Sequence, residues 1–100
     1  MTRHVAVDPV AARGFRQARR YLLQPGSGRL ARARWEAVVS VQSRLRDHPY
    51  LGVPSLDMPG LRQLIVAEHR ILYRVHPDTG DPETAGDVRI LAVLGPGQSA

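Results

Sequence analysis

The stretch LRQLIVAEHRILYRV, residues 61–75, determines the kind of fold that this chain can form. The helical spacing of the preceding segment does not continue here, and we interpret both halves of the stretch with a period of two, which is typical of half-buried β-strands. We therefore predict strands over residues 61–66 and 70–75, joined by a tight connection at 67–69. The second half of the chain is thus expected to form a sheet.

Further segments complete the predicted sheet. The polar stretch PDTGDPETAG, residues 77–86, is rich in turn formers and predicts a long hairpin loop. The segment that follows it, DVRILAVL at 87–94, is expected to form a third strand. Because these connections are too short for crossovers, the three strands should form an antiparallel meander. A short strand is also predicted over residues 3–7, and the Pro- and Gly-rich stretch 48–60 is expected to be a loop.

The pattern between residues 9 and 47 is helical. Asp8-Pro9 is typical of a helix start, and the apolar residues that follow are spaced to lie on one helix face. They are Ala11, Phe15, Ala18 and Leu22, with Gly14 as a weak point between them. After the turn QPGSG, a second helix is predicted over 29–47, because Pro49 ends it. Its apolar stripe comprises Leu30, Ala33, Trp35, Ala37, Val38, Val41 and Leu45.

These elements predict an α+β fold in one domain spanning residues 1–100. An N-terminal strand is followed by an antiparallel helical hairpin and then by the three-stranded antiparallel meander. The hairpin should pack on one face of the sheet. By strand parity, that buried face is expected to carry Ile71, Tyr73, Val75, Val88, Ile90 and Ala92.

The composition limits the chemistry that is open to this protein. The chain has 100 residues and a formal net charge of +5, and it contains neither cysteine nor lysine, so every basic residue other than histidine is arginine. Disulfide bonds, thiolate zinc sites and lysine-based mechanisms are therefore excluded. Neither a secretory signal nor a membrane-spanning run is visible, so we expect a cytoplasmic protein. The positive charge favours polyanionic partners such as nucleic acid or an acidic peptide.

Strand parity also predicts a second, cationic face of the sheet. Its expected arginines are Arg62, Arg70, Arg74 and Arg89, and the aliphatic residues among them are Leu64, Val66, Leu72, Leu91 and Val93. One interpretation is a solvated outer face, as antiparallel sheets often have. So many aliphatic side chains favour the other interpretation, a surface that an acidic amphipathic peptide or a nucleic-acid backbone would cover.

The motifs HPYLGVPSLDMPGLRQLIVAEHRILYRV and DVRILAVLG resemble the RelE/ParE superfamily of bacterial type II toxins. The resemblance implies a toxin that is neutralised by direct binding of a cognate antitoxin, so that the two form a hetero-oligomer and operator DNA is contacted only indirectly, through the antitoxin. The segments LRQL and RILYRV are closer to ParE-like members, which inhibit DNA gyrase by binding. We expect acidic residues of an antitoxin segment to pair with Arg70, Arg74 or Arg89.

The resemblance leaves two alternatives open. RelE-like members cleave messenger RNA on the ribosome, and here Arg62, Arg70 and Arg74 would stabilise charge in that reaction. No titratable side chain follows Arg89, however, and this departs from the acid and base contributors of RelE-like enzymes. The other alternative is an antitoxin-binding module without toxicity that serves in operon repression.

No cofactor or metal site is expected from the sequence. The histidines, His4, His48, His69 and His76, show no ligand spacing, so they are interpreted as ordinary surface or turn residues.

Overall fold

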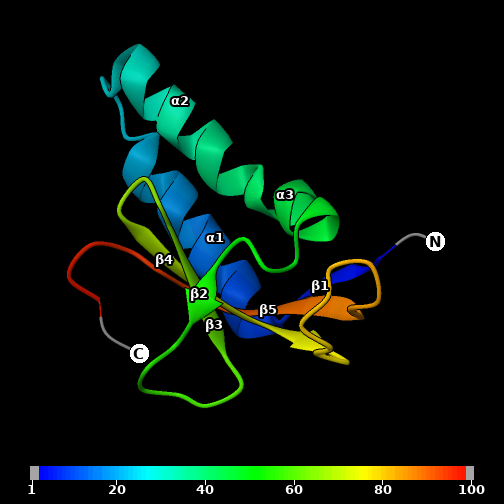
Figure 1. Ribbon diagram of the computed structural model, residues 1–100. Coiled ribbons are helices and arrows are strands. Elements are labelled where there is room, and N and C mark those ends of the chain that lie inside the picture. Colours follow the sequence, from blue (N-terminus) through cyan, green and yellow to red (C-terminus); the bar gives the residue numbers. More distant parts are fainter. Residues whose placement is uncertain (1–2, 99–100) are drawn as a thin grey trace.

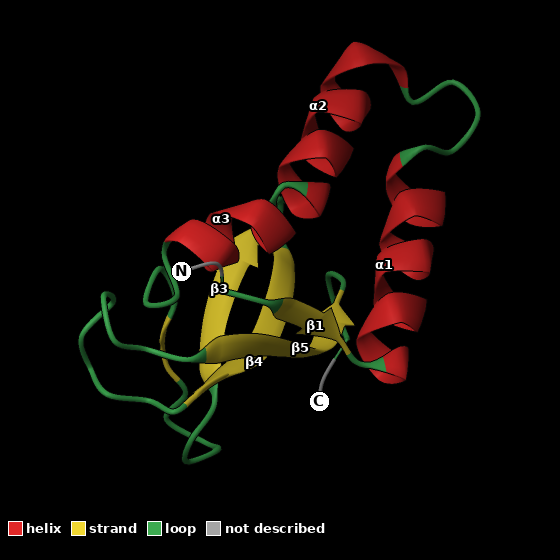
Figure 2. Ribbon diagram, turned by 90° about the vertical axis from the view of Figure 1, so that its right-hand side faces the viewer, coloured by secondary structure: helices red, strands yellow, loops and turns green. Residues whose placement is uncertain are grey.

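A five-stranded sheet with helices on one of its faces forms the structure, a computed structural model that describes residues 3–98 (Figures 1 and 2). The strands lie in the order β1-β5-β4-β3-β2, and every neighbouring pair is antiparallel except β1 and β5. The elements in chain order are β1 (Val5–Val7), α1 (Pro9–Leu22), α2 (Gly28–Val39), α3 (Val41–Asp47), β2 (Val53–Pro54), β3 (Arg62–Val66), β4 (His69–His76) and β5 (Asp87–Leu94).

The predicted fold class is confirmed by this arrangement. The short N-terminal strand, the two antiparallel helical arms and the β3-β4-β5 meander all occur in the expected order. Two features go beyond the expectation. The N-terminal strand β1 lies parallel to β5 at one edge of the sheet, and the two-residue strand β2 forms within the segment expected to be a loop.

Helix α1 begins where the sequence predicts, with Pro9 in its first turn. Asp8 does not cap the helix with its side chain. Its carboxylate instead accepts a hydrogen bond from Arg89 of β5 at 2.6 Å, so this residue ties the start of α1 to the sheet.

The second helical arm is bent rather than continuous. The Ser40 hydroxyl donates a hydrogen bond to the Ala37 carbonyl at 2.8 Å, and back-bonding of this kind often bends a helix. Helix α3 beyond the bend buries Val41 and Leu45 against the sheet, whereas Leu30 at the start of α2 remains exposed. The predicted stripe is therefore buried only in its C-terminal half, because α2 packs mainly on α1 and extends past the sheet (Figure 2).

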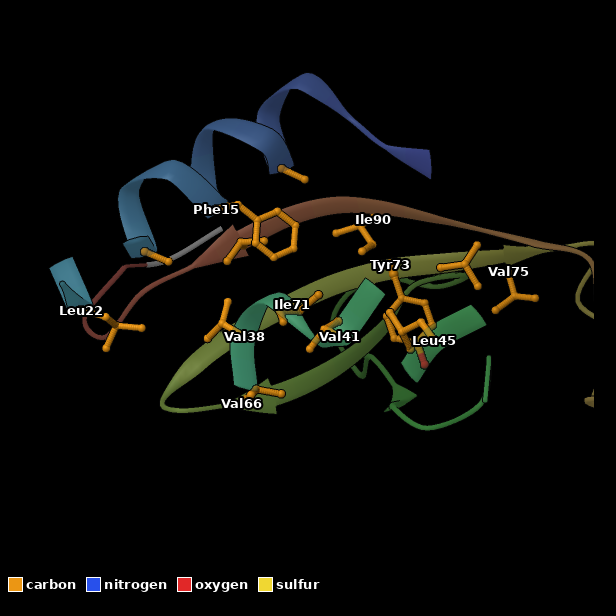
Figure 3. Close-up of a cluster of buried hydrophobic side chains, with 14 residues drawn as sticks. Phe15, Leu22, Val38, Val41, Leu45, Val66, Ile71, Tyr73, Val75 and Ile90 are labelled. Atoms are coloured by element: carbon orange, nitrogen blue, oxygen red, sulfur yellow. The ribbon is translucent and has the colours of Figure 1, made fainter. Parts of the chain in front are cut away.

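The core lies between the helices and the sheet (Figure 3). Phe15 of α1 points toward Ile71 and Ile90 of the sheet, and Leu22 lies at the end of the cluster on the side of Val38. Gly14 allows α1 to approach the sheet closely, because a Cβ at this position would lie 2.5 Å from the Val93 carbonyl oxygen. The glycine that weakens the helix in isolation is thus required by its packing.

The predicted buried face of β5 is wrong at one residue. Tyr73 pairs with Ile90 and Leu72 pairs with Ala92, so Leu91 is an extra residue that forms a β-bulge. Before the bulge, the even-numbered residues of β5 point into the core, and beyond it the odd-numbered ones do. Val93 rather than Ala92 therefore joins the core. Simple alternation cannot reveal a bulge, because the irregularity arises from pairing with the neighbouring strand.

Candidate binding surface

The face of the sheet that turns away from the helices is the candidate site, and we call it the open face. It is positioned by alternation along β4, where Ile71, Tyr73 and Val75 enter the core while Arg70, Leu72 and Arg74 point the other way. The strand register sets their neighbours. Arg70 lies between Ile65 and Leu94, Leu72 lies between Gln63 and Ala92, and Arg74 lies opposite Arg89.

Three of the four predicted arginines therefore gather on the open face, and Arg62 does not. Arg62 pairs with Tyr73, a core residue, so it lies on the side of the sheet that carries the helices. Its guanidinium is 4.8 Å from the ring centroid of Tyr50, and it donates to the Gly52 carbonyl at 3.2 Å through Nε and 2.9 Å through Nη2. Arg62 thus holds the segment before β2 in place.

The turn between β3 and β4 explains this error. The strands are joined by only two residues, Ala67 and Glu68, both of which have positive φ, as a type I′ hairpin turn requires. Such a turn pairs Val66 with His69. Each even-numbered residue of β3 therefore lies opposite an odd-numbered residue of β4, and the two side chains point to the same side of the sheet. The predicted three-residue connection would shift the register by one, and a one-residue shift moves every side chain to the other face. For the same reason Leu64 and Val66, predicted on the cationic face, pack instead with the helix-side core.

The charges of the open face are only partly compensated. Arg89 forms an ion pair with Asp8 at 2.6 Å, and its side chain is about half exposed. Within residues 3–98, Arg70 and Arg74 form no ion pair with an acidic side chain. Arg74 is exposed and Arg70 is half-buried, so two cations remain available to an anionic partner.

Apolar side chains adjoin these cations. Ile65 is 64% exposed and lies beside Arg70, while Val53 of β2 is 59% exposed and lies beside Gln63. Leu91 and Leu94 are half-buried, and neither packs against the helix-side core. Leu72, although it belongs to this face, is only 4% exposed. The open face therefore offers an apolar strip that is bordered by guanidinium groups.

The phenol of Tyr73 has a structural role on the helix side of the sheet. Its hydroxyl donates to the Pro49 carbonyl at 2.9 Å and accepts from the Gly52 amide at 2.8 Å. Burial raises the pKa of Tyr73 above its ordinary value, although the hydrogen bond from Gly52 and the nearby Arg62 act in the opposite direction. A neutral phenol with both hydrogen bonds made is a fixed link and not a proton carrier.

The three arginines named for the nuclease alternative do not gather in one place. Arg70 and Arg74 lie on the open face, and Arg62 lies across the sheet from them. Over residues 3–98, no group of three or more histidine or acidic side chains is placed to hold a metal ion. In the same part of the chain, no helix is long and apolar enough to cross a membrane.

Two residues have roles that the sequence patterns do not predict. Asp8 has the position of a helix cap, but it neutralises Arg89 across the sheet edge. His69 has the position of a turn residue, but it is the first residue of β4 and only 2% exposed. A two-residue hairpin turn at Ala67 and Glu68 would have predicted the position of His69. With that turn, His69 belongs to β4, and its side chain points to the helix side of the sheet.

Comparison with known proteins supports the fold. No family model matches the chain, and no curated protein does so either. Among solved structures, the chain is similar to a chain of the "Chromosomal ParDE TA system from P. aeruginosa", with a TM-score of 0.68 and 14% sequence identity. The match covers 94% of this chain and 96% of that chain. The two proteins thus share a fold over nearly their whole lengths, which is the fold that the sequence resemblance implied.

Proposed function

We propose that this chain is the toxin component of a type II toxin–antitoxin system and that it acts by binding a protein. The observation that carries the proposal is the open face, where Arg70 and Arg74 have no acidic partner within residues 3–98 and Arg70 lies beside the exposed side chain of Ile65. Similarity to a chain of a ParDE toxin–antitoxin system supports the choice of system.

The proposed inhibitor is a cognate antitoxin whose acidic, amphipathic segment lies across the open face. Its carboxylates would form charge-assisted bidentate pairs with arginine, and its apolar residues would cover the strip beside Ile65 and Leu94. The two proteins would form a cytoplasmic hetero-oligomer, and operator DNA would be contacted through the antitoxin. The proposed cellular target is DNA gyrase, which the chain would inhibit without a covalent step.

Ribosome-dependent cleavage of messenger RNA is less well supported. General acid–base catalysis needs groups that lie within hydrogen-bond reach of the same reacting atoms. The two sides of the sheet separate Arg62 from Arg70 and Arg74, and the buried phenol of Tyr73 is already hydrogen-bonded twice. This placement favours a binding protein over a nuclease.

The test is to induce the gene alone in a bacterium and to measure growth, DNA supercoiling and protein synthesis together. Growth arrest with filamentation and lost negative supercoiling, while translation continues, is the expected outcome. Cleavage of transcripts within translated codons would instead assign the chain to the ribosome-dependent nucleases. Harmless expression would favour a non-toxic antitoxin-binding module. Co-expression with the neighbouring gene is the control, because an antitoxin encoded there should restore growth.

A further inference from the structure

A cavity of about 260 Å³ lies on the helix side of the sheet, separate from the open face. Gln17 and Tyr21 of α1 form one wall, and the segment after β5, including Gly95, Pro96 and Gln98, forms another. This segment is folded back on itself, because the Gly95 amide donates to the Gln98 side-chain carbonyl at 2.6 Å. Exposed residues on both walls leave the cavity accessible from solvent.

His69 supplies the polar group of this cavity. Its Nδ1 lies 2.9 Å from the Ala67 carbonyl, and because a carbonyl only accepts, this contact assigns the ring proton to Nδ1. Nε2 of the neutral ring then carries a lone pair. It faces Gly95, where a Cβ would lie 3.5 Å from it, and no group within residues 3–98 donates a hydrogen bond to it. A residue that is only 2% exposed thus presents a free acceptor to the cavity.

The rest of the lining is apolar or aromatic. The ring of Tyr21 meets the His69 ring edge-on with centroids 6.2 Å apart, and Ala18 and Pro96 lie nearby in the lining. An engineered cavity of about 150 Å³ is enough to bind benzene, so this larger cavity can accept one aromatic ring. Its acceptor selects a ring that carries a hydrogen-bond donor, because an N–H or O–H group would satisfy Nε2.

The position of the cavity connects it to the open face. His69 directly precedes Arg70, Leu94 directly precedes Gly95, and Arg70 and Leu94 pair with each other on β4 and β5. A polypeptide that crosses the open face at Arg70 therefore reaches the cavity by passing around this end of the sheet. Aromatic side chains that fill pockets carry much of the energy at protein interfaces.

We propose that the cavity beside His69 is an anchor pocket for one tyrosine or tryptophan side chain of the protein partner. The ring would fill the space between α1 and the 95–98 segment, and its O–H or N–H would donate to Nε2 of His69. This inference rests on the proposed function for the identity of the partner, but the chemistry of the pocket can be tested on the chain alone.

The first experiment uses p-cresol, which carries the side-chain groups of tyrosine, and toluene, which lacks the hydroxyl. NMR titration of the isotope-labelled full chain should show saturable p-cresol shifts at the cavity residues and at Nε2 of His69. Toluene should bind about fivefold more weakly, since it cannot make the hydrogen bond. Equal affinities, or no saturable shift at these residues, would overturn the inference.

Two variants locate the binding. Gly95→Leu should fill the cavity and abolish p-cresol binding, whereas Ile65→Ala on the open face should leave it unchanged. His69→Phe keeps a ring but removes the acceptor, so it should eliminate the preference for p-cresol over toluene. This variant tests the inference independently of whether Gly95→Leu folds. A preference that survives His69→Phe would overturn the assigned role of Nε2.

The final arm repeats the p-cresol titration on the complex with the neutralising partner. Loss of p-cresol binding is expected, because the partner's aromatic side chain would occupy the cavity. A complex that still binds p-cresol at this site would overturn only the anchor inference. If no protein forms a complex with the chain, the proposed function is overturned as well.

Discussion

Arg74 of β4 and Arg89 of β5 lie directly opposite each other on the open face of the sheet. Like charges in this position destabilise a sheet. Asp8 compensates one of them, since its carboxylate lies 2.6 Å from Arg89, and the guanidinium of Arg74 has no acidic partner within residues 3–98. Repulsion between these two guanidinium groups lowers the stability of the free chain, and a partner's carboxylate bound beside Arg74 would remove that repulsion.

The first prediction is that Arg74→Glu stabilises the free chain. The new carboxylate would lie opposite Arg89, and a favourable cross-strand charge pair should raise the free energy of unfolding by about 0.2–1 kcal/mol. Urea denaturation at low and high salt measures the effect, which should shrink as salt screens the pair. Arg70→Glu is the matched control, because Arg70 lies opposite Leu94 and gains no such pair. A loss of stability in Arg74→Glu would contradict the proposed repulsion.

The second prediction concerns partner binding. Arg70→Glu combined with Arg74→Glu should weaken binding of the antitoxin by more than about 100-fold, because two charge-assisted contacts are lost and repulsion replaces them. Isothermal titration calorimetry with the co-purified antitoxin measures this change. The control is Arg44→Glu with Arg46→Glu on α3, which changes the net charge equally at exposed positions on the helix side. Equal losses in the two double variants would mean that net charge, and not the open face, determines affinity.

A third prediction separates Arg62 from the other arginines. Arg62→Met keeps the apolar stem but loses the hydrogen bonds to Gly52 and the contact with Tyr50, so the free energy of unfolding should fall by about 1–2 kcal/mol. Antitoxin affinity should remain within about twofold of the parent value. If Arg62→Met instead weakens binding as strongly as the Arg70/Arg74 double variant, Arg62 belongs to the binding surface.

Gly14→Ala provides a fourth prediction, in which helix propensity and packing oppose each other. Propensity alone would stabilise α1 by about 1 kcal/mol. The new methyl group, however, would lie 2.5 Å from the Val93 carbonyl oxygen and 2.9 Å from Val93 Cβ, and overpacking typically costs about 1–3 kcal/mol. Because backbone atoms form the closest contact, the methyl group cannot turn away, and we expect a net loss of stability. Thermal denaturation shows whether Gly14→Ala lowers or raises the stability, with Arg13→Ala on the exposed side of α1 as the reference.

The fifth prediction uses the raised pKa of Tyr73. Removing its hydroxyl in Tyr73→Phe leaves the Pro49 carbonyl and the Gly52 amide without their partner, which should cost about 1–3 kcal/mol at neutral pH. Tyr21→Phe is the control, because that side chain is 55% exposed.

The same substitution should change the response to alkaline pH. Since burial raises the pKa of Tyr73 in the folded chain, the unfolded chain releases its proton first, and stability falls as the pH rises above the ordinary value of 10.0. The chain has neither lysine nor cysteine, so no side chain of these two types contributes to the pH dependence in this range. Unfolding measured between pH 9 and 11, a range of about one unit on either side of that value, should show a steeper loss in the parent than in Tyr73→Phe. Equal slopes would contradict the raised pKa.

Local sequence patterns determined the main helices and strands and their order, but they predicted neither β2 nor the break between α2 and α3. The four- and three-residue spacing of Ala11, Phe15, Ala18 and Leu22 defines α1, and alternation from residue 61 onward defines the meander, because both periodicities follow from backbone geometry alone. The absence of lysine and cysteine also limits the available chemistry, because composition is the same in every conformation of the chain.

Only the tertiary structure decided which side chains share a surface. The two-residue turn at Ala67 and Glu68 moved Arg62 to the helix side, and the bulge at Leu91 exchanged Ala92 for Val93 in the core. Pairing between strands sets both features, and a shift of one residue reverses every side chain of a strand. The burial of His69 beside the 95–98 segment depends likewise on contacts between residues far apart in the chain, which no local pattern encodes.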